Sequence, residues 1–310
     1  VSVRIGCTLP LCRKRLCHIL PVFITRYLSA LSLPISTISS NAFLLSSVRC
    51  LSLPPATRDL VSEAIIKYCG KKKNTVFGVV VAANQLVTLV RMKKYYIHPA
   101  DLHLLFNLIN ATESFKSSET WIPICLPKFD SSGFLHAHVS YISEDVCLVL
   151  VTVDRNAFSE LSEARSKITE KLEKQNTFAA ISSALSSGSY TCESIDLAEV
   201  RYFLYKSRSS AQYTAPEPAP CYQTPEDMKR LLSIFLSIQN RFHIASRPIK
   251  LCYRATSQEL ILAWSTQAFE LFAVFAPTAS KFAVLTAVNK LLKWAKKEEE
   301  KLFILTAPTF

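Results

Sequence analysis

The regular alternation of apolar and polar residues begins with an amphipathic stretch over residues 57–68, which predicts a short helix. Two apolar, β-branched runs follow at 76–83 and 86–92, with Asn84 and Gln85 between them. Runs of this kind around a polar pair are typical of a β-hairpin. We therefore expect a helix and then a two-stranded ribbon in this part of the chain.

The segment after this ribbon predicts a second helix. Pro99 falls in its first turn and Asp101 lies near the positive end of the helix dipole. Apolar residues then recur with helical spacing on one face: Leu102, Leu105, Phe106 and Ile109. That face is expected to pack on a sheet.

Three strands and a long helix are predicted next. The strands cover residues 121–126, 134–142 and 146–153, and the middle one alternates between an apolar face and a face with His136, His138 and Ser140. We interpret this as one buried and one wetter side. The helix over 156–175 is expected to bury Phe158, Leu161, Ile168 and Leu172, and a short helix is expected over 178–185.

The same order of elements then occurs again. A hairpin is predicted over residues 200–205 and 211–214, and Thr224 and Pro225 open a helix as its N-cap and first residue. This helix is expected to bury Leu231, Phe235, Ile238 and Phe242. Strands follow at 249–254, 259–265 and 268–275, and a last helix over 278–297 is expected to bury Phe282, Leu285, Val288 and Leu292.

This repeated β-β-α-β-β-β-α order predicts an α/β chain of the α+β type. We expect two tandem units, each an antiparallel five-stranded sheet flanked by helices. The order is similar to that of longin domains. Five glycines in 310 residues also argue against a glycine-rich nucleotide-binding enzyme.

Residues 1–47 differ from the rest of the chain. They are rich in serine, lack acidic residues, contain three prolines and show no sustained period. We expect a disordered segment, best explained by a misjoined or truncated gene, with a transit peptide as the alternative. Residues 27–48 are uncharged but too polar for a membrane span, so no transmembrane helix is predicted.

The net charge of +12 is concentrated at the start of the chain. Seven basic residues and no acidic residue fall within positions 1–58, which leaves +5 for the remainder. The body is thus mildly basic, which suits an anionic membrane surface, an acidic partner or an ordinary solvated surface. We expect no nucleic-acid partner. The ten cysteines form no CxxC motif, so we expect them to be free thiols in a reducing, cytosolic compartment.

The sequence offers little catalytic chemistry. His136 and His138 point to the same face of a strand, as two metal ligands would, but no third ligand is evident, so a structural pair is favoured. The chain has no GxSxG elbow, no GxxxxGK[ST] loop and no GxGxxG motif. We therefore predict no enzyme, no metal and no cofactor.

Basic clusters are the remaining candidates for a functional surface. They are expected to contact phosphoinositide membranes or a partner, although solvated helix faces would look the same. Trp294 beside the last cluster is interpreted as a core residue. The candidate contact residues are Lys71, Lys72, Lys73, Lys93, Lys94, Lys293, Lys296 and Lys297, and further basic residues are Lys206, Arg208 and Lys290.

Several stretches resemble the Mon-one (SAND) family of vacuolar fusion proteins. They are QLVTLVR at 85–91, HPADLHLLFNLI at 98–109, CLPKF at 125–129, FLYKS at 203–207, ASRP at 245–248, AFEL at 268–271 and KKEEEKLFILT at 296–306. The strings occur in the family order, and the resemblance covers residues 48–310, with the last string at the usual family carboxy terminus. It identifies 48–73 as a remnant of a first longin domain, 74–188 as the second and 189–310 as the third.

The resemblance also implies a function. Family members pair with a Ccz-one-type longin protein as a heterodimer, which is a guanine nucleotide exchange factor for a late-endosomal Rab GTPase of the Rab-seven type. They act in endosome maturation, vacuole or lysosome fusion and autophagy, as cytoplasmic proteins recruited peripherally to those membranes. Exchange activity resides in the first longin domains, and most of that domain is absent from the resemblance. We therefore expect a scaffold subunit, with a longin-like adaptor or lipid-binding module without exchange activity as the alternative.

Overall fold

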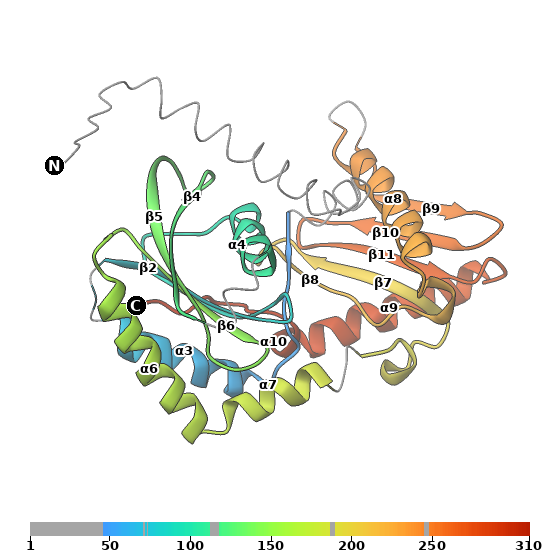
Figure 1. Cartoon of the computed structure of the whole chain (residues 1–310). Coiled ribbons are helices and arrows are strands. Elements are labelled where there is room, and N and C mark those ends of the chain that lie inside the picture. The colour runs from blue at the N-terminus through green and yellow to red at the C-terminus, as the bar shows by residue number, and fades with distance from the viewer. Residues whose placement is uncertain (1–45, 71, 73, 112–117, 187–189, 245–247) are drawn as a thin grey trace.

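The computed structural model describes residues 46–70, 72, 74–111, 118–186, 190–244 and 248–310. Within these residues the chain forms two neighbouring α/β units, each built on its own sheet (Figure 1). Two separate sheets are what the repeated element order predicts. The disorder expected for residues 1–47 concerns a segment outside the described residues, except for Ser46 and Ser47.

The first sheet is five-stranded and antiparallel, as predicted. Its spatial order is β3-β2-β6-β5-β4. The hairpin turn lies one residue earlier than expected, because Ala83 and Asn84 adopt the positive φ values of 43° and 61° that a tight two-residue turn requires. The strands are β2 (Thr75–Ala82), β3 (Gln85–Arg91), β4 (Thr120–Leu126), β5 (Asp130–Tyr141) and β6 (Val146–Thr152).

Helices cover both faces of this first sheet. On one face lies α4 (Pro99–Ala111), whose four predicted core residues are all buried. On the other face lie α3 (Pro55–Cys69), α6 (Phe158–Lys174) and α7 (Thr177–Ser186). Every residue of β2 is buried, which explains why its sequence is a continuous apolar run.

Two expectations for this unit were wrong. His138 and Ser140 are buried, because α6 covers the face of β5 that we interpreted as the wetter one. Phe158 is 40% exposed, since it is the first residue of α6 and lies at the margin of the sheet. Leu161, Ile168 and Leu172 are buried as predicted.

The second sheet has one strand more than predicted. Its own five strands are antiparallel, and β1 (Val48–Arg49) adds a sixth, parallel to β8 at the edge. The order is β1-β8-β7-β11-β10-β9. The other strands are β7 (Val200–Ser207), β8 (Gln212–Thr214), β9 (Leu251–Ala255), β10 (Leu260–Ser265) and β11 (Phe269–Phe275).

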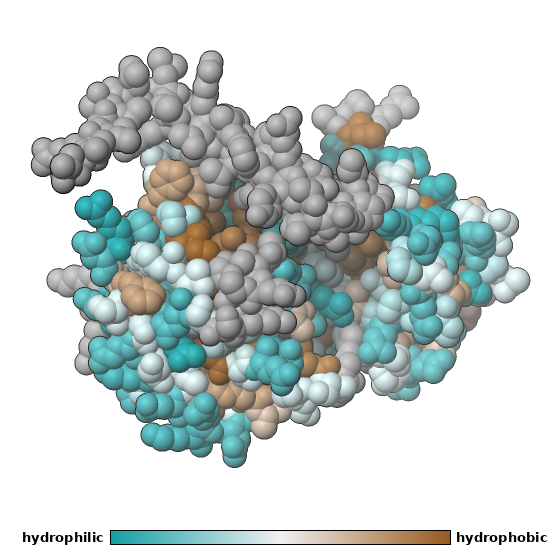
Figure 2. Space-filling model, in the orientation of Figure 1, coloured by the Kyte–Doolittle hydropathy of each residue, from teal (hydrophilic) through white to brown (hydrophobic). Residues whose placement is uncertain are grey.

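The helix α8 (Pro225–Phe242) packs on one face of the second sheet. The Thr224 side chain caps its N-terminus by accepting a hydrogen bond from the backbone N–H of Asp227, as the sequence predicts. Its four predicted core residues are buried. Figure 2 shows a largely hydrophilic surface over α6 and α8, consistent with amphipathic helices whose apolar sides face the sheets.

The opposite face carries α9 (Lys281–Lys297), and its predicted buried stripe was wrong. Of the four residues expected inside, Val288 is buried and Leu292 packs partly buried against the core, whereas Phe282 is 82% and Leu285 54% exposed. The helix instead buries Val284, Ala287, Val288, Leu291 and Ala295. The alanines allow close approach to a sheet face that already supplies bulky side chains such as Phe203 and Phe275.

Short segments at the two ends of the described chain run between the units. Cys50 bridges to Leu86 on β3, and the tail after α10 (Glu299–Leu302) bridges through Thr309 to Arg91 at the other end of the same strand. α3 completes the core of the first unit with β2, β3 and α6. That residues 48–73 derive from a first longin domain stays a prediction.

Candidate interaction surfaces

The joint between the two units is organised by Arg58 of α3. Its side chain is only 6% exposed, and burial lowers the pKa of its guanidinium group. The guanidinium donates hydrogen bonds to the backbone carbonyls of Leu51 and Val87, at 3.0 and 3.1 Å. Three further carbonyls, those of Glu300, Lys301 and Phe303, accept at 2.9 to 3.2 Å. One cation thus connects the chain ahead of α3 (residues 46–54, the first segment), β3, and α10 with the residues after it (303–310, the carboxy-terminal tail).

A second polar residue crosses the joint from the other unit. Gln212 of β8 accepts a hydrogen bond from the backbone N–H of Ile304 at 2.8 Å and donates to its carbonyl at 3.1 Å. The thiol of Cys50 also donates to the Gln212 side-chain oxygen at 3.0 Å. Because all three residues are buried, these bonds fix β1, β8 and the tail in one arrangement. The two units are therefore connected through β1 and the tail.

A cavity of about 580 Å³ lies beside this joint. It is lined by the first segment, α7, α9 and α10, through residues that include Arg49, Pro54, Ala184, Tyr190, Trp294 and Lys301. The lining mixes polar and apolar groups without a cluster of catalytic side chains. Trp294 is partly buried and packs against Tyr190 and Phe203, so it caps the core of the second unit, as interpreted from the sequence.

The structure separates the predicted lysine clusters. Lys71 and Lys73 lie outside the described residues. Lys72 is partly buried, pairs with the Glu160 carboxylate at 3.7 Å and also donates to the Glu160 carbonyl, so it fastens the loop before β2 to α6. Lys93 and Lys94 are exposed between β3 and α4.

The last cluster lies on the final turns of α9, where Lys293, Lys296 and Lys297 are exposed. None of these three ammonium groups, nor those of Lys93 and Lys94, pairs with a carboxylate among the described residues. These five lysines are free to meet an anionic partner. They come from different units and do not belong to one element.

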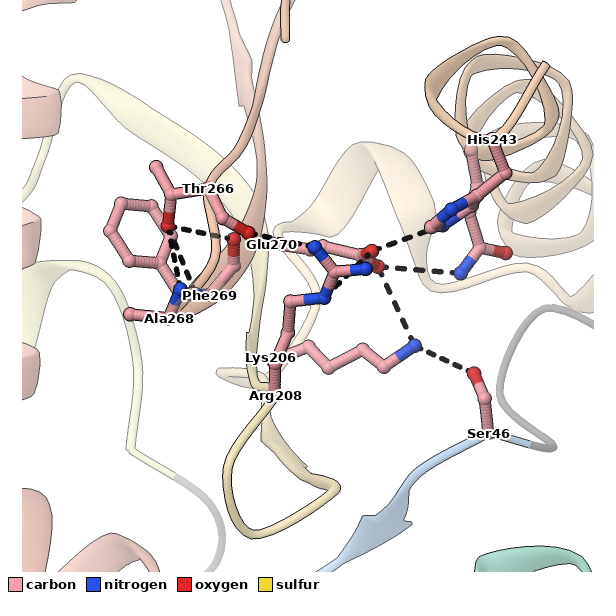
Figure 3. Close-up of polar contacts among 9 residues, drawn as sticks. Ser46, Lys206, Arg208, His243, Thr266, Ala268, Phe269 and Glu270 are labelled. Carbon is pink, nitrogen blue, oxygen red and sulfur yellow. Dashed lines mark hydrogen bonds and ion pairs between the residues drawn. The ribbon is translucent and has the colours of Figure 1, made fainter. Parts of the chain in front are cut away.

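Lys206 and Arg208 belong to a polar network inside the second unit (Figure 3). Both point at the buried carboxylate of Glu270, with Lys206 Nζ at 3.5 Å and Arg208 Nε at 3.7 Å. His243 Nε2 reaches the same carboxylate from α8 at 3.2 Å. Lys206 also donates to Ser46 at 2.6 Å, and burial lowers its pKa. The Glu270 carboxylate thus links the sheet to Gln239 and His243 at the end of α8, and Lys206 links it to Ser46, so Lys206 is engaged within the protein.

The other end of α8 is held in a similar way. Arg230 forms two hydrogen bonds with the buried carboxylate of Glu259, at 2.6 and 2.9 Å, and Tyr222 donates to it at 2.9 Å. These bonds hold the pKa of the Glu259 carboxyl below its usual value, with the Arg230 bonds as the largest cause. Carboxylates thus anchor α8 to the sheet at both ends.

The histidine pair is part of the packing of β5 under α6. His138 Nε2 lies 3.0 Å from the Glu119 carboxylate, and burial lowers the pKa of His138. His136 stacks on Trp121, with ring centroids 5.5 Å apart. No group of three or more His, Cys, Asp or Glu side chains suited to a metal ion occurs in the part of the chain that the structure describes. The arrangement is that of a structural pair.

The cysteines of the described region fit the expectation of free thiols. Six of them are buried and Cys221 is exposed, and none of the seven is in a disulfide. Burial raises the pKa of the Cys50, Cys69, Cys147 and Cys192 thiols to about 12, so these groups are unreactive small hydrophobes. No helix in the described ranges is long and apolar enough to cross a membrane.

Sequence reasoning missed two features of the structure. Arg58 has no local signal, because its acceptors are carbonyls from distant segments. The exposure of Phe282 and Leu285 was missed because α9 carries two apolar stripes, and the bulkier stripe was taken as the buried one. The small residues Ala287 and Ala295 were the available signal for the other stripe.

Comparison with known proteins assigns both units. Residues 73–170 match the family model described as the second longin domain of FUZ, MON1 and HPS1. Residues 199–299 match the model of the third longin domain of the same three proteins. Each match covers the five antiparallel strands of one sheet, so both units are longin domains.

Similar full-length proteins extend this assignment. The chain is 44% identical to Protein SAND of Takifugu rubripes over 269 residues, which is 86% of this chain and 51% of that protein. It is 42% identical to vacuolar fusion protein MON1 homolog A of Homo sapiens over 271 residues, 87% of this chain and 41% of that protein. The Cryptococcus neoformans (strain JEC21) vacuolar fusion protein MON1 is 39% identical over 273 residues, 87% and 44% of the two chains.

The chain thus spans about half the length of the curated relatives it matches. The chain contains a second and a third longin domain in that order, and it is 39% to 44% identical to MON1 and SAND proteins over most of its length. This chain belongs to the MON1 (SAND) family of vacuolar fusion proteins.

Proposed function

We propose that this chain is a scaffold subunit in vacuolar fusion, without catalytic activity of its own. Its partner in this proposal is a Ccz-one-type longin protein, and the heterodimer serves a late-endosomal GTPase of the Rab-seven type as part of a guanine nucleotide exchange complex. The observation that carries the proposal is the joint, in which Arg58 links α3 to β3 and the carboxy-terminal tail and Gln212 links the tail to β8. A fixed pair of domains presents a large preorganised surface to a partner.

Two other features support the proposal. The relatives are named vacuolar fusion proteins. The buried ionisable groups of the second unit, such as Glu259 and Glu270, are satisfied by hydrogen bonds that anchor α8, which is a structural role. Exchange chemistry is assigned in this proposal to the first longin domains of the complete proteins, so the present chain contributes assembly and placement.

The cellular setting is part of the same proposal. We place the protein in the cytoplasm, recruited peripherally to late endosome, vacuole or lysosome membranes, with roles in endosome maturation and autophagy. Lys93, Lys94, Lys293, Lys296 and Lys297 would add electrostatic attraction to an anionic leaflet, at about 1 kcal/mol per lysine near the surface.

A pull-down with a Ccz-one-type protein at low salt tests the proposal. The chain is expected to retain the partner, and the complex is expected to persist through gel filtration. Retention of no partner would refute the scaffold role. Addition of a Rab-seven-type GTPase loaded with a fluorescent guanine nucleotide then tests the division of labour, because this chain alone should leave the release rate unchanged.

A second candidate function is a lipid-binding adaptor that acts without a protein partner. The five unpaired lysines favour it. Flotation with vesicles containing a phosphoinositide separates the two candidates. Binding by the isolated chain that is lost when Lys293, Lys296 and Lys297 are all changed to Glu would favour the adaptor. Flotation only in the presence of the Ccz-one-type protein favours the scaffold.

A further inference from the structure

In the described part of the chain, one sheet edge is neither covered by another segment nor interrupted by a proline. Two sheets have four edges, and the β3 and β8 edges are covered by the chain itself, through the bridges of Cys50 and Thr309 and through β1. β4 forms the third edge and carries the exposed Pro123, which has no N–H to donate. The fourth edge, β9, has neither cover nor proline among the described residues (Figure 1).

The backbone groups that β9 offers at this edge follow from its pairing with β10. Lys250 and Thr256 hydrogen-bond to the neighbouring strand, through Ser265 at 2.8 Å and Glu259 at 2.9 Å. Hydrogen-bonding residues alternate in an antiparallel pair. Leu251, Tyr253 and Ala255 occupy the alternate positions between Lys250 and Thr256. Their backbone N–H and C=O groups therefore point away from β10. They can accept one further strand.

Apolar side chains lie beside these groups. Leu251 is 57% and Tyr253 41% exposed, and both lie opposite β10 residues, Trp264 and Leu262, that pack toward α9. Lys281 Nζ lies 6.0 Å from the centre of the Tyr253 ring, which places the start of α9 next to β9. We call Leu251, Tyr253, Phe282 and Leu285 the β9 patch. Each has an exposed fraction above 40%, and Phe282 and Leu285 follow Lys281 within the first turns of α9.

The charged residues around the β9 patch indicate which kind of partner can bind there. Lys250, Arg254 and Lys281 are exposed around it, whereas the one acid in β9, the following turn and the first turn of α9 is Glu259, which is buried and bound by Arg230. A second copy of this chain would bring six cations to one contact with no acid to balance them, which is unfavourable. A partner strand with carboxylates on its flanks fits instead.

We propose that β9 accepts an edge strand of a partner protein, with apolar side chains against the β9 patch and acidic side chains against Lys250, Arg254 and Lys281. The strand joins by main-chain hydrogen bonds, and the patch supplies specificity. This inference rests on the proposed function, because the partner in question is the Ccz-one-type protein. It adds the surface and the mode of contact.

Two variants and a matched control test it in a titration of the chain with the Ccz-one-type protein. Phe282→Asp removes the most exposed member of the β9 patch and should not disturb folding, because its side chain is in solvent. Tyr253→Pro removes an outward-pointing N–H, which an edge strand tolerates. Tyr96→Asp is the control, since Tyr96 is 60% exposed in the first unit, away from the patch.

The expected result is a loss of affinity of about 30-fold or more for Phe282→Asp and Tyr253→Pro, the range of interface hot spots. Tyr96→Asp should bind as the unchanged chain does. Unchanged affinity for Phe282→Asp would overturn the β9 inference and leave the proposed function intact, even if Tyr253→Pro did not fold. An unchanged chain that binds no partner would overturn both. Dimers of the chain alone, or vesicle binding, that Phe282→Asp abolishes would assign the patch to another occupant and also overturn the inference.

Discussion

Replacing Arg58 by methionine tests the joint between the longin domains. Methionine keeps much of the bulk of the side chain but removes one donor from each of five backbone carbonyls, of which that of Lys301 still accepts from the Leu53 N–H. Three of these hydrogen bonds, to Leu51, Val87 and Phe303, are buried. A buried acceptor left without a partner costs about 1 to 3 kcal/mol.

The free energy of unfolding should therefore fall by about 3 kcal/mol, the lower end of the sum for three carbonyls. The lower end applies because a cavity of about 340 Å³ borders Arg58 and admits water to some of the freed groups. It also applies because the variant no longer buries a charge. Arg58→Lys should lose about half as much, since an ammonium group has three donors and no fork geometry.

Urea denaturation followed by far-ultraviolet circular dichroism measures this loss. Arg155→Met is the matched control, because Arg155 is exposed and a surface substitution changes stability by about 0.5 kcal/mol or less. Hydrogen exchange should also show faster exchange of residues 300–310 in Arg58→Met. Equal midpoints for Arg58→Met and Arg155→Met would show that the carbonyl cluster does not stabilise the joint.

Four further outcomes are expected. By urea denaturation, Leu291→Ala should cost about 2 to 4 kcal/mol and Leu285→Ala less than about 0.5, because Leu291 is buried and Leu285 is exposed. Equal losses would contradict the observed buried face of α9. Thr224→Ala should cost about 1 kcal/mol by loss of the cap on α8, and Thr224→Ser should restore most of it. Gly78→Ala should lower the melting temperature, because a Cβ there would lie 2.7 Å from an Ile65 methyl group.

The fourth outcome concerns pH, and its sign follows from His138. Burial holds the pKa of His138 below the ordinary value of 6.5, so between these two pKa values the unfolded chain binds more protons than the folded one. Stability contributed by neutral His138 is therefore present above pH 6.5 and falls as the pH drops toward the folded pKa. His138→Gln should flatten this part of a melting-temperature profile, and an identical slope in both proteins would exclude His138 as its source.

Much of the fold follows from local pattern. Thr224, Pro225 and the apolar spacing after them predict α8 and its buried face, because capping and periodicity are properties of neighbouring residues. The five antiparallel strands of each sheet are likewise predicted from apolar and β-branched runs, and the order of the elements along the chain repeats as predicted. The family resemblance then identified the two units as a second and a third longin domain, which the family models confirm.

Features that depend on distant segments could not be predicted. β1 has two residues, too few for a pattern, and it is a strand because Val48 and Arg49 pair with Gln212 and Tyr213. The buried role of Lys206 depends on Glu270 in another strand, so the sequence showed only a surface-like lysine. Which face of α9 is buried depends on the space between the helix and the sheet. That space fits the small side chain of Ala287 and not larger neighbouring side chains.

The most direct test of the central claim is the mass of the complex that the unchanged chain forms with a Ccz-one-type longin protein. Sedimentation velocity at low salt should show a 1:1 species whose mass is the sum of the 34.7 kDa chain and its partner. The two proteins sedimenting as separate species over the full concentration range would contradict the scaffold role proposed for these two joined longin domains.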